Sequence, residues 1–336
     1  MPPVAPCVVV VASAVEPRLR SETAIALHAL CGLPLVGHVL GAVGALDPRR
    51  LAVVIGPDDD DLAKELEATG AEVSRVPARV RHDPCAAVLT ALGAWATDEL
   101  DVDFDPEDDD VLLIPAAVPL IDGETLRAFH RAHRAGDRAA TVLVGPDGDG
   151  TGALDSSVWF VRRAFLAPAL RRAQVPELSA IGEVLRESGH EVATHLVPDA
   201  IGHRAITDRT GLAEAEAELR SRINARWLRR GVTMHDPVRT YIDIDVQLDA
   251  DVTLHPGVML RGATVVGRGT EIGPGCHLVD SRIGSYCRLE QTSAELATVG
   301  DHARVGPFAV LTQGSEVAAA TVTGPFYTAG PDARRP

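Results

Sequence analysis

The sequence predicts an α/β protein built from a mostly parallel sheet domain, a connecting helix and a coiled domain of hexapeptide repeats. Three observations support this prediction. Short apolar runs alternate with helix-like segments up to about residue 200, a stretch dense in strong helix formers follows, and aliphatic residues then recur every six positions. We expect domains at residues 1–206, 207–231 and 232–325, with a disordered tail at 326–336.

The first domain contains several uniformly apolar runs that predict buried strands. These runs lie at residues 8–12, 51–55, 111–114, 140–144 and 158–161, and helix-like segments lie at 35–45, 60–69, 84–95 and 123–135. Such alternation indicates a mostly parallel sheet with helices on both faces. Ligands of these sheets bind at the carboxyl ends of the strands, so we expect any site there.

The hexapeptide pattern is the clearest signal in the chain. The six-residue spacing links Ile242, Leu248, Leu254, Leu260, Val266, Ile272 and Leu278. We expect each unit to form one flat side of a triangular coil, with its aliphatic side chain pointing inward. The phase slips at Ile283, resumes at Leu289 and continues from Val299 to Val317 after an insertion around Glu295. This pattern predicts about four coils.

Composition limits the classes of partner. The net charge of -15 disfavours nucleic acid and anionic membranes, because phosphate binding needs a concentrated positive field. No apolar run approaches the roughly 18 to 20 residues of a membrane span, and the amino-terminal stretch has no basic leader, so we expect a cytoplasmic protein. Five widely spaced cysteines predict reduced, buried thiols and no metal site.

Two groups of polar residues invite a functional interpretation, but a solvated surface explains them more simply. His130 and His133 share one helix face, which we expect to be exposed. The acidic clusters Asp58 to Asp61 and Asp101 to Asp110 do not have the spacing of a calcium loop, and we expect solvated loops.

Several segments resemble one family. They are HALCGLPLVGHVLGAV, VPLIDGETLRAF, TDRTGLAEAEAELRSRI, GVTMHDPVRTYID and VGPFAVL. Over about residues 7 to 317 the chain resembles the bacterial bifunctional N-acetylglucosamine-1-phosphate uridylyltransferase/glucosamine-1-phosphate acetyltransferases. The resemblance implies a Rossmann-like, GT-A-like nucleotidyltransferase domain, a left-handed parallel β-helix and a homotrimer formed through that helix.

The motifs that bind nucleotide and metal in that family are degenerate here. The family loop LAAGxGTRMKS is replaced by VASAVEPRLRS, in which only Arg18 and Ser21 match residues of interest and Arg20 adds a positive charge. Val15, Glu16 and Pro17 replace the small residues that let backbone amides approach phosphates. Arg18 and Arg20 are therefore vestigial catalytic candidates, and Arg18 and Ser21 are weak candidates for phosphate binding.

The other family positions have changed as well. Ile25 replaces the phosphate-steadying lysine, and Lys64 is the only lysine in the chain. Ala117 and Thr207 stand where the family holds magnesium with a carboxylate and an asparagine, so we expect no metal. The segment 83–87 replaces the base-reading GTGHA, and the sugar-binding segment between residues 144 and 158 is shortened. From the resemblance, we expect this chain to lack the later coils that carry acetyl transfer in the family.

These losses predict a pseudoenzyme without either activity, which needs no cofactor and acts as an oligomeric binding or regulatory scaffold. A protein partner and a small ligand in a remodelled pocket both remain open. The alternative is a sugar-1-phosphate nucleotidyltransferase in which Arg18 and Arg20 neutralise phosphate and an aspartate such as Asp83 holds magnesium. Acyl transfer by His277 or His302 is a third hypothesis, although we expect these two residues and His255 to be coil-surface residues.

Overall fold

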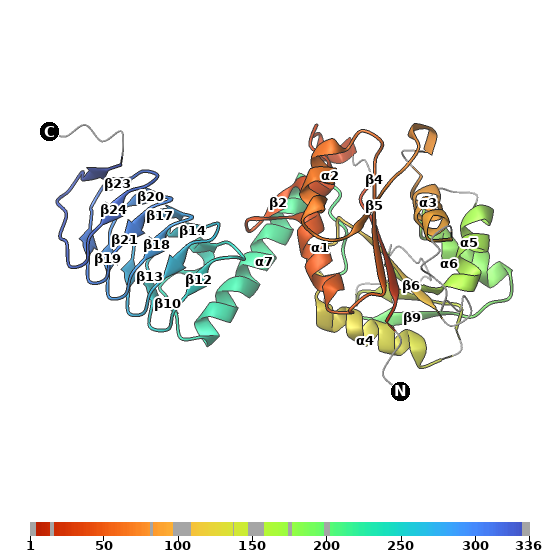
Figure 1. Cartoon of the computed structure of the whole chain (residues 1–336). Helices are drawn as coiled ribbons and strands as arrows, with labels where there is room; N and C mark the ends of the chain where they lie inside the picture. Colours follow the sequence, from red (N-terminus) through yellow and green to blue (C-terminus); the bar gives the residue numbers. More distant parts are fainter. Residues whose placement is uncertain are drawn as a thin grey trace. The chain divides into compact units, whose positions relative to one another are not determined.

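The computed structural model describes residues 5–13, 17–80, 83–96, 109–136, 138–146, 158–173, 177–197 and 202–330. The chain forms two compact units (Figure 1). The first comprises Met1–His28 with Pro34–Ala215, and the second comprises Ala29–Leu33 with Glu216–Pro336. Within the described residues, no helix is both long and apolar enough to cross a membrane.

A seven-stranded sheet forms the centre of the first unit, in the order β5-β4-β1-β6-β8-β7-β9. Its strands are β1 (Cys7–Val11), β4 (Arg50–Ile55), β5 (Glu72–Arg75), β6 (Asp110–Pro115), β7 (Ala140–Val144), β8 (Trp159–Arg162) and β9 (Val192–Leu196). Strand β8 runs antiparallel to β6 and β7, whereas the other pairings are parallel. The predicted mostly parallel sheet is confirmed.

Helices cover both faces of this sheet (Figure 1). The side chains of β1 alternate, so that Val8 and Val10 pack among α1 (Leu35–Gly44), α2 (Asp60–Glu67) and α4 (Gly123–Arg134). Val9 and Val11 pack on the opposite face among α3 (Pro84–Ala96), α5 (Arg163–Arg172) and α6 (Ala180–Glu187). Helix α7 (Arg209–Arg229) follows the sheet domain.

One surface expected to be solvated is instead buried. His130 and His133 on α4 lie against β6, with His130 Nε2 3.1 Å from Asp110 Oδ2 and His133 Nε2 3.3 Å from Asp110 Oδ1. His133 Nδ1 is 2.8 Å from Thr141 Oγ1. The exposed-face prediction for these histidines, and the solvated-loop prediction for Asp110, are therefore wrong. Their partners Asp110 and Thr141 lie on strands β6 and β7 on either side of α4 in the sequence, which the helical spacing of the histidines could not reveal.

The second unit contains a left-handed parallel β-helix with three parallel sheets. The first sheet contains β10 (Thr233–Met234), β13 (Thr253–Leu254), β16 (Glu271–Ile272), β19 (Arg288–Leu289) and β22 (Arg304–Val305). The second contains β11 (Tyr241–Ile242), β14 (Met259–Arg261), β17 (His277–Val279), β20 (Ser293–Glu295), β23 (Val310–Leu311) and β25 (Thr328–Ala329). The third contains β12 (Gln247–Leu248), β15 (Val265–Val266), β18 (Arg282–Ile283), β21 (Thr298–Val299) and β24 (Glu316–Val317).

Each coil contributes one strand to each sheet, so the five strands of the two shorter sheets mark five coils, one more than expected. The residues of the six-residue pattern are buried in a single core. The expected insertion around Glu295 is wrong, because Ala294 takes the inward position of β20. The segments from Leu289 to Ala294 and from Ala294 to Val299 are shortened units, and alanine hid this position from a search for large aliphatic residues.

The carboxyl-terminal part of the β-helix extends beyond the expected boundary at residue 325. Strand β25 pairs with β23 through Val310 and Thr328, and residues 331–336 of the expected tail lie outside the described residues. The five cysteines are free and buried, as predicted. Burial, followed by the charge of Glu216, raises the pKa of Cys31 to about 12, so this thiol stays protonated at neutral pH.

Candidate functional site

The strand order defines where a ligand of this sheet would bind. From β1 the chain moves outward through β4 to β5 and then returns to the other side of β1, where it forms β6. The connections therefore change direction between β1 and β6. In open α/β sheets, the crevice beyond the carboxyl ends at such a switch point is the usual ligand site. We refer to the carboxyl ends of β1, β6 and β7 and the residues that follow them as the carboxyl edge.

Small, uncharged residues follow the strands at this switch point. Ala12 and Ser13 come after β1, and Ala116 and Ala117 come after β6. All four are buried, with Ala117 the most exposed at 8%. The backbone continues the strand pairing, because Ala116 N donates to Val11 O at 2.9 Å. None of these four residues carries a charge that would hold a phosphate or a cation.

The phosphate-binding candidates lie on the segment that follows β1. Arg18 is part of a short 3-10 helix (Pro17–Leu19), and Arg20 has a left-handed backbone with a φ of 49°. Arg18, Arg20 and Ser21 are exposed, and Ser21 Oγ accepts a hydrogen bond from Thr23 N at 3.2 Å. Val15 and Glu16, which replace family glycine-loop residues, lie outside the described residues.

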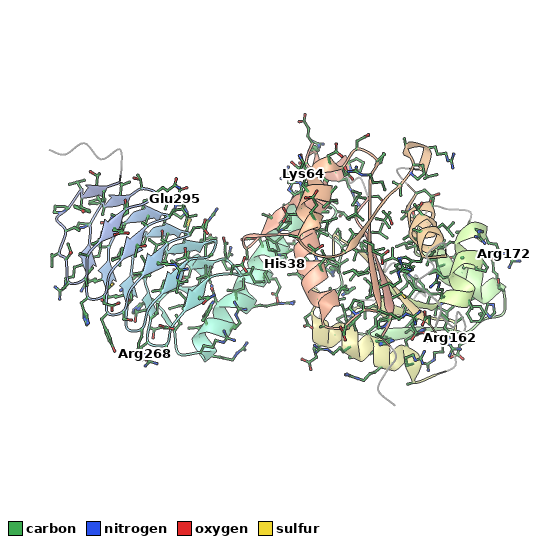
Figure 2. The ribbon with its side chains drawn as sticks, viewed as in Figure 1. His38, Lys64, Arg162, Arg172, Arg268 and Glu295 are labelled. Carbon is green, nitrogen blue, oxygen red and sulfur yellow. The ribbon has the colours of Figure 1, made fainter. Side chains whose placement is uncertain are left out.

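Lys64, the only lysine in the sequence, pairs with an acidic residue of its own helix. It lies on α2, where it is exposed (Figure 2), and its Nζ is 3.7 Å from Asp61 Oδ1. Ile25, which occupies the place of the family lysine, is buried.

The structure brings together the two positions that correspond to the family's metal ligands. Ile206 N donates a hydrogen bond to Ala117 O at 2.8 Å. Thr207 is the next residue in the chain, so this hydrogen bond places it near Ala117. A methyl group and a hydroxyl do not supply the anionic oxygens that magnesium requires. The nearby carboxylate of Asp208 caps α7 by accepting from Gly211 N at 2.8 Å. The residues at this position therefore do not fit a magnesium ion.

The same conclusion holds more widely. Across the part of the chain that the structure describes, no group of three or more His, Cys, Asp or Glu side chains is arranged to hold a metal. Asp83, the metal candidate of the alternative hypothesis, accepts from Ala86 N at 3.0 Å at the start of α3. This contact gives Asp83 a helix-capping role. Burial, then the charges of Asp83 and Glu177, raise the pKa of Cys85 to about 12, which makes it a poor nucleophile.

Two residues at the carboxyl edge were not identified from the sequence. Gly145 follows β7, and a β-carbon built there would overlap the imidazole of His203, so the ring lies directly against this glycine. Arg209, at the start of α7, donates from Nε to Leu19 O at 3.0 Å. Burial, followed by the Arg209 charge, lowers the pKa of His28. These contacts join segments far apart in sequence, and no local pattern predicts them.

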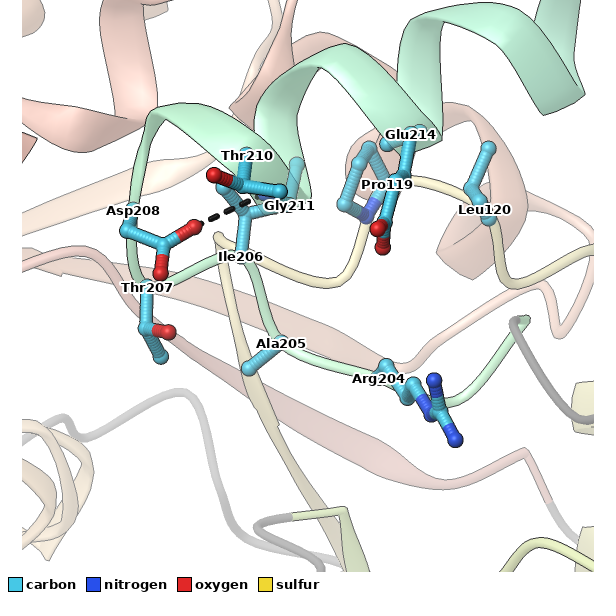
Figure 3. A pocket seen from close by; sticks show the side chains of 11 residues that line it. Pro119, Leu120, Arg204, Ala205, Ile206, Thr207, Asp208, Thr210, Gly211 and Glu214 are labelled. Atoms are coloured by element: carbon cyan, nitrogen blue, oxygen red, sulfur yellow. Dashed lines mark hydrogen bonds between the residues drawn. The ribbon is translucent and has the colours of Figure 1, made fainter.

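A cavity of about 260 Å³ lies beside this segment. Pro119 and Leu120 line one part of it, and residues 204–208 with the first turns of α7 line the rest (Figure 3). Arg204 places a positive charge on its wall, and Asp208 and Glu214 place negative charges there, as Figure 3 shows. The cavity is therefore polar, and its wall carries more acidic than basic side chains.

The histidines of the β-helix lie outside its core. His277 and His302 are exposed, and the ring of His302 stacks on Tyr286 with centroids 5.3 Å apart. His255 Nε2 is 2.7 Å from Glu271 Oε1, and its ring stacks on His235. These positions agree with the prediction of coil-surface residues.

The fold and the comparisons with known proteins agree. A family model described as a MobA-like NTP transferase domain matches residues 18–230. A solved nucleotidyl transferase from Methanothermobacter has a similar fold, with a TM-score of 0.51 at 18% identity over 66% of this chain and 97% of that chain. The chain is thus of the nucleotidyltransferase class.

Two relatives identify the family more closely. The bifunctional protein GlmU of Streptomyces avermitilis is 32% identical, with 95% of this chain and 72% of the relative covered. GlmU of Kineococcus radiotolerans is 34% identical, with 97% and 72% covered. The chain belongs to the GlmU family.

Proposed function

We propose that this chain is a GlmU-family scaffold that catalyses neither uridylyl transfer nor acetyl transfer. The observation that carries the proposal is the pair Ala117 and Thr207, joined across the Ile206–Ala117 hydrogen bond where a magnesium site would be needed. Phosphoryl-transfer sites depend on positioned cations to neutralise the developing charge. A methyl group at the centre of such a site removes that contribution.

The proposed scaffold is a homotrimer formed through the β-helix, and it binds a protein partner or a small ligand. Left-handed helices of this kind present flat faces, which suit closed symmetric assemblies. Exposed hydrophobic side chains on the β-helix support an assembly surface. They include Tyr286, Leu296, Phe308 and Val310.

A second candidate function is a sugar-1-phosphate nucleotidyltransferase with a rebuilt site. The observation in its favour is the exposure of Arg18 and Arg20 on the segment that follows β1. Arginine binds phosphate oxygens in a bidentate manner and can neutralise part of their charge. This function would need a side chain that holds the magnesium ion. Asp83, the residue expected to hold it, instead caps α3.

Isothermal titration calorimetry separates the two functions. The full chain is titrated with UTP, UDP-N-acetylglucosamine and acetyl-coenzyme A, each with and without magnesium. The scaffold proposal expects no magnesium-dependent heat with any of them. Magnesium-dependent UTP binding would overturn it, and pyrophosphate release with a panel of sugar phosphates would then identify the substrate. An active GlmU relative, assayed in parallel, shows that the ligands and buffers are competent.

A further inference from the structure

Two arginines near the end of α7 lie on one tryptophan. The guanidinium carbons of Arg226 and Arg230 are each 5.3 Å from the centroid of the Trp227 ring. The two arginines are four positions apart, so they share one face of the helix. All three residues belong to the second unit, whereas the carboxyl edge belongs to the first. This cluster is therefore not part of the candidate site described above.

Polar groups of the cluster are buried without a partner. Trp227 is 5% exposed, and neither its indole Nε1 nor Arg226 Nε has a hydrogen-bond partner among the described residues. No ion pair between described residues involves Arg226 or Arg230, whereas Arg222 on the same helix pairs with Glu218 at 2.7 Å. A buried donor without an acceptor destabilises the fold. A ligand that supplies acceptors would remove this cost.

The end of α7 does not by itself explain this pairing. Arginines near a helix carboxyl terminus are favourable because they bond the last carbonyls and offset the helix dipole. Here Trp227 O already accepts from Arg230 N at 3.0 Å and from Val232 N at 3.1 Å. Burial, followed by the Arg230 charge, lowers the pKa of Arg226, although an arginine remains charged at neutral pH. An anion beside both arginines would relieve their repulsion.

From these contacts we propose that Arg226, Arg230 and Trp227 form a binding site for a tetrahedral oxyanion of the phosphate class. A guanidinium presents a planar fork of N–H donors that matches two phosphate oxygens. Two forks and one indole N–H suit an ion with four oxygens better than a planar carboxylate with two. Arg226 is half-buried and Arg230 is exposed, so the site is open to solvent. The ligand is a free phosphate or the phosphate group of a small ester.

Fluorine NMR reports on this site through its own tryptophan. The full chain is labelled with 5-fluorotryptophan, which gives one signal for each of the three tryptophans, and Trp227→Phe identifies the signal of Trp227. Titration with inorganic phosphate, at an ionic strength held constant with sodium chloride, should shift this signal until it saturates. Arg226→Gln and Arg230→Gln should each raise the dissociation constant about tenfold or more, the effect of losing one charge-assisted hydrogen bond.

Matched variants separate a built site from a general effect of charge. Arg288→Gln removes the same charge from the second unit, but Arg288 is already paired with Glu290 at 2.9 Å, so phosphate binding should not change. Arg230→Lys keeps the charge without the fork and should bind with an affinity between those of the parent and Arg230→Gln. Circular dichroism checks that each variant is folded, and the exposed Arg230 gives the test if Arg226→Gln does not fold.

Titrations with glycerol 3-phosphate and sodium acetate complete the test. Saturation by glycerol 3-phosphate assigns the site to phosphate esters as well as the free ion, and silence assigns it to the free ion alone. No shift with either phosphate would overturn the proposal, as would an equal shift with acetate or a shift that both arginine variants keep. The site needs neither magnesium nor a nucleotide, so this outcome is independent of the calorimetry that tests the scaffold.

Discussion

Position 117 decides the charge of the carboxyl edge. Its alanine supplies no carboxylate beside Thr207, and the nearby carboxylate of Asp208 accepts the hydrogen bond that caps α7. Introducing Ala117→Asp should destabilise the fold by about 2 kcal/mol or more without a divalent cation, because a carboxylate is then buried without a partner. Manganese or magnesium should recover part of that loss, since the cation would bind the folded state.

Thermal unfolding with and without each cation tests this prediction. Ala117→Asn is the control, because it has nearly the same size and no charge and should show no recovery. The unaltered chain should also give the same midpoint with and without magnesium. A magnesium-dependent shift in the unaltered chain would mean that the edge holds a cation through groups other than position 117.

The sequence is most informative about residue identity at the edge and least informative about contacts. Ala117 and Thr207 lie in segments that resemble the family, so their replacement of metal ligands can be inferred from the sequence alone. The contact between His203 and Gly145 cannot be inferred from the sequence, because the two residues are far apart in the chain and a glycine has no side chain that would suggest a contact. For the same reason, the burial of His130 and His133 depends on residues that lie on other elements.

At the scale of elements, Asp110 holds α4 to the start of β6. Burial by itself raises the pKa of Asp110, but hydrogen bonds from His130 and His133 and the charge of Arg134 outweigh it and hold that pKa well below its usual range. A carboxyl with a lowered pKa stabilises the fold above its unfolded pKa, which is about 3.9. The contribution is lost as the pH falls toward the folded value.

Asp110→Asn should therefore lower the free energy of unfolding by about 3 kcal/mol near neutral pH, where breaking a buried ion pair leaves its partners uncompensated. The gap between the unaltered chain and the variant should narrow once the pH falls below about 4. Denaturant unfolding at several pH values measures both. Asp61→Asn, at an exposed site, should change stability by less than about 0.5 kcal/mol throughout. A gap that widens in acid would contradict the assigned cause.

The β-helix shows how far a repeat pattern determines an element. Each six-residue unit correctly placed an inward residue through Leu278, since those positions are buried. The two shortened units around Ala294 broke the pattern, because their inward residues are five positions apart and the shared inward residue is a small alanine. The six-residue spacing predicts a buried core. A shortened unit can be recognised only after the structure has identified its inward residue.

Substitutions at inward positions test how tightly the shortened and the six-residue units are packed. Ala294→Leu should overpack the shortened unit and cost about 1–3 kcal/mol. Leu260→Ala, in a full unit, should leave a cavity and cost about 2–5 kcal/mol. Ser293→Ala, at an exposed position of the same sheet, should change the free energy of unfolding by less than about 0.5 kcal/mol. Denaturant unfolding ranks the three, and a neutral Ala294→Leu would show that the shortened unit has spare volume.

At the scale of the whole molecule, assembly through the β-helix is the prediction that the scaffold proposal needs most. A binding scaffold without catalysis acts through the surfaces it presents, and a symmetric assembly multiplies them. Light scattering coupled to gel filtration should give three times the chain mass, and the mass should hold on dilution through the micromolar range. The trimer should persist at high salt, because the exposed groups on the β-helix that support it, such as Phe308 and Val310, are apolar. A monomer at all concentrations would leave the chain without the proposed multivalent role, and an assembly that dissolves in salt would indicate charged contacts instead.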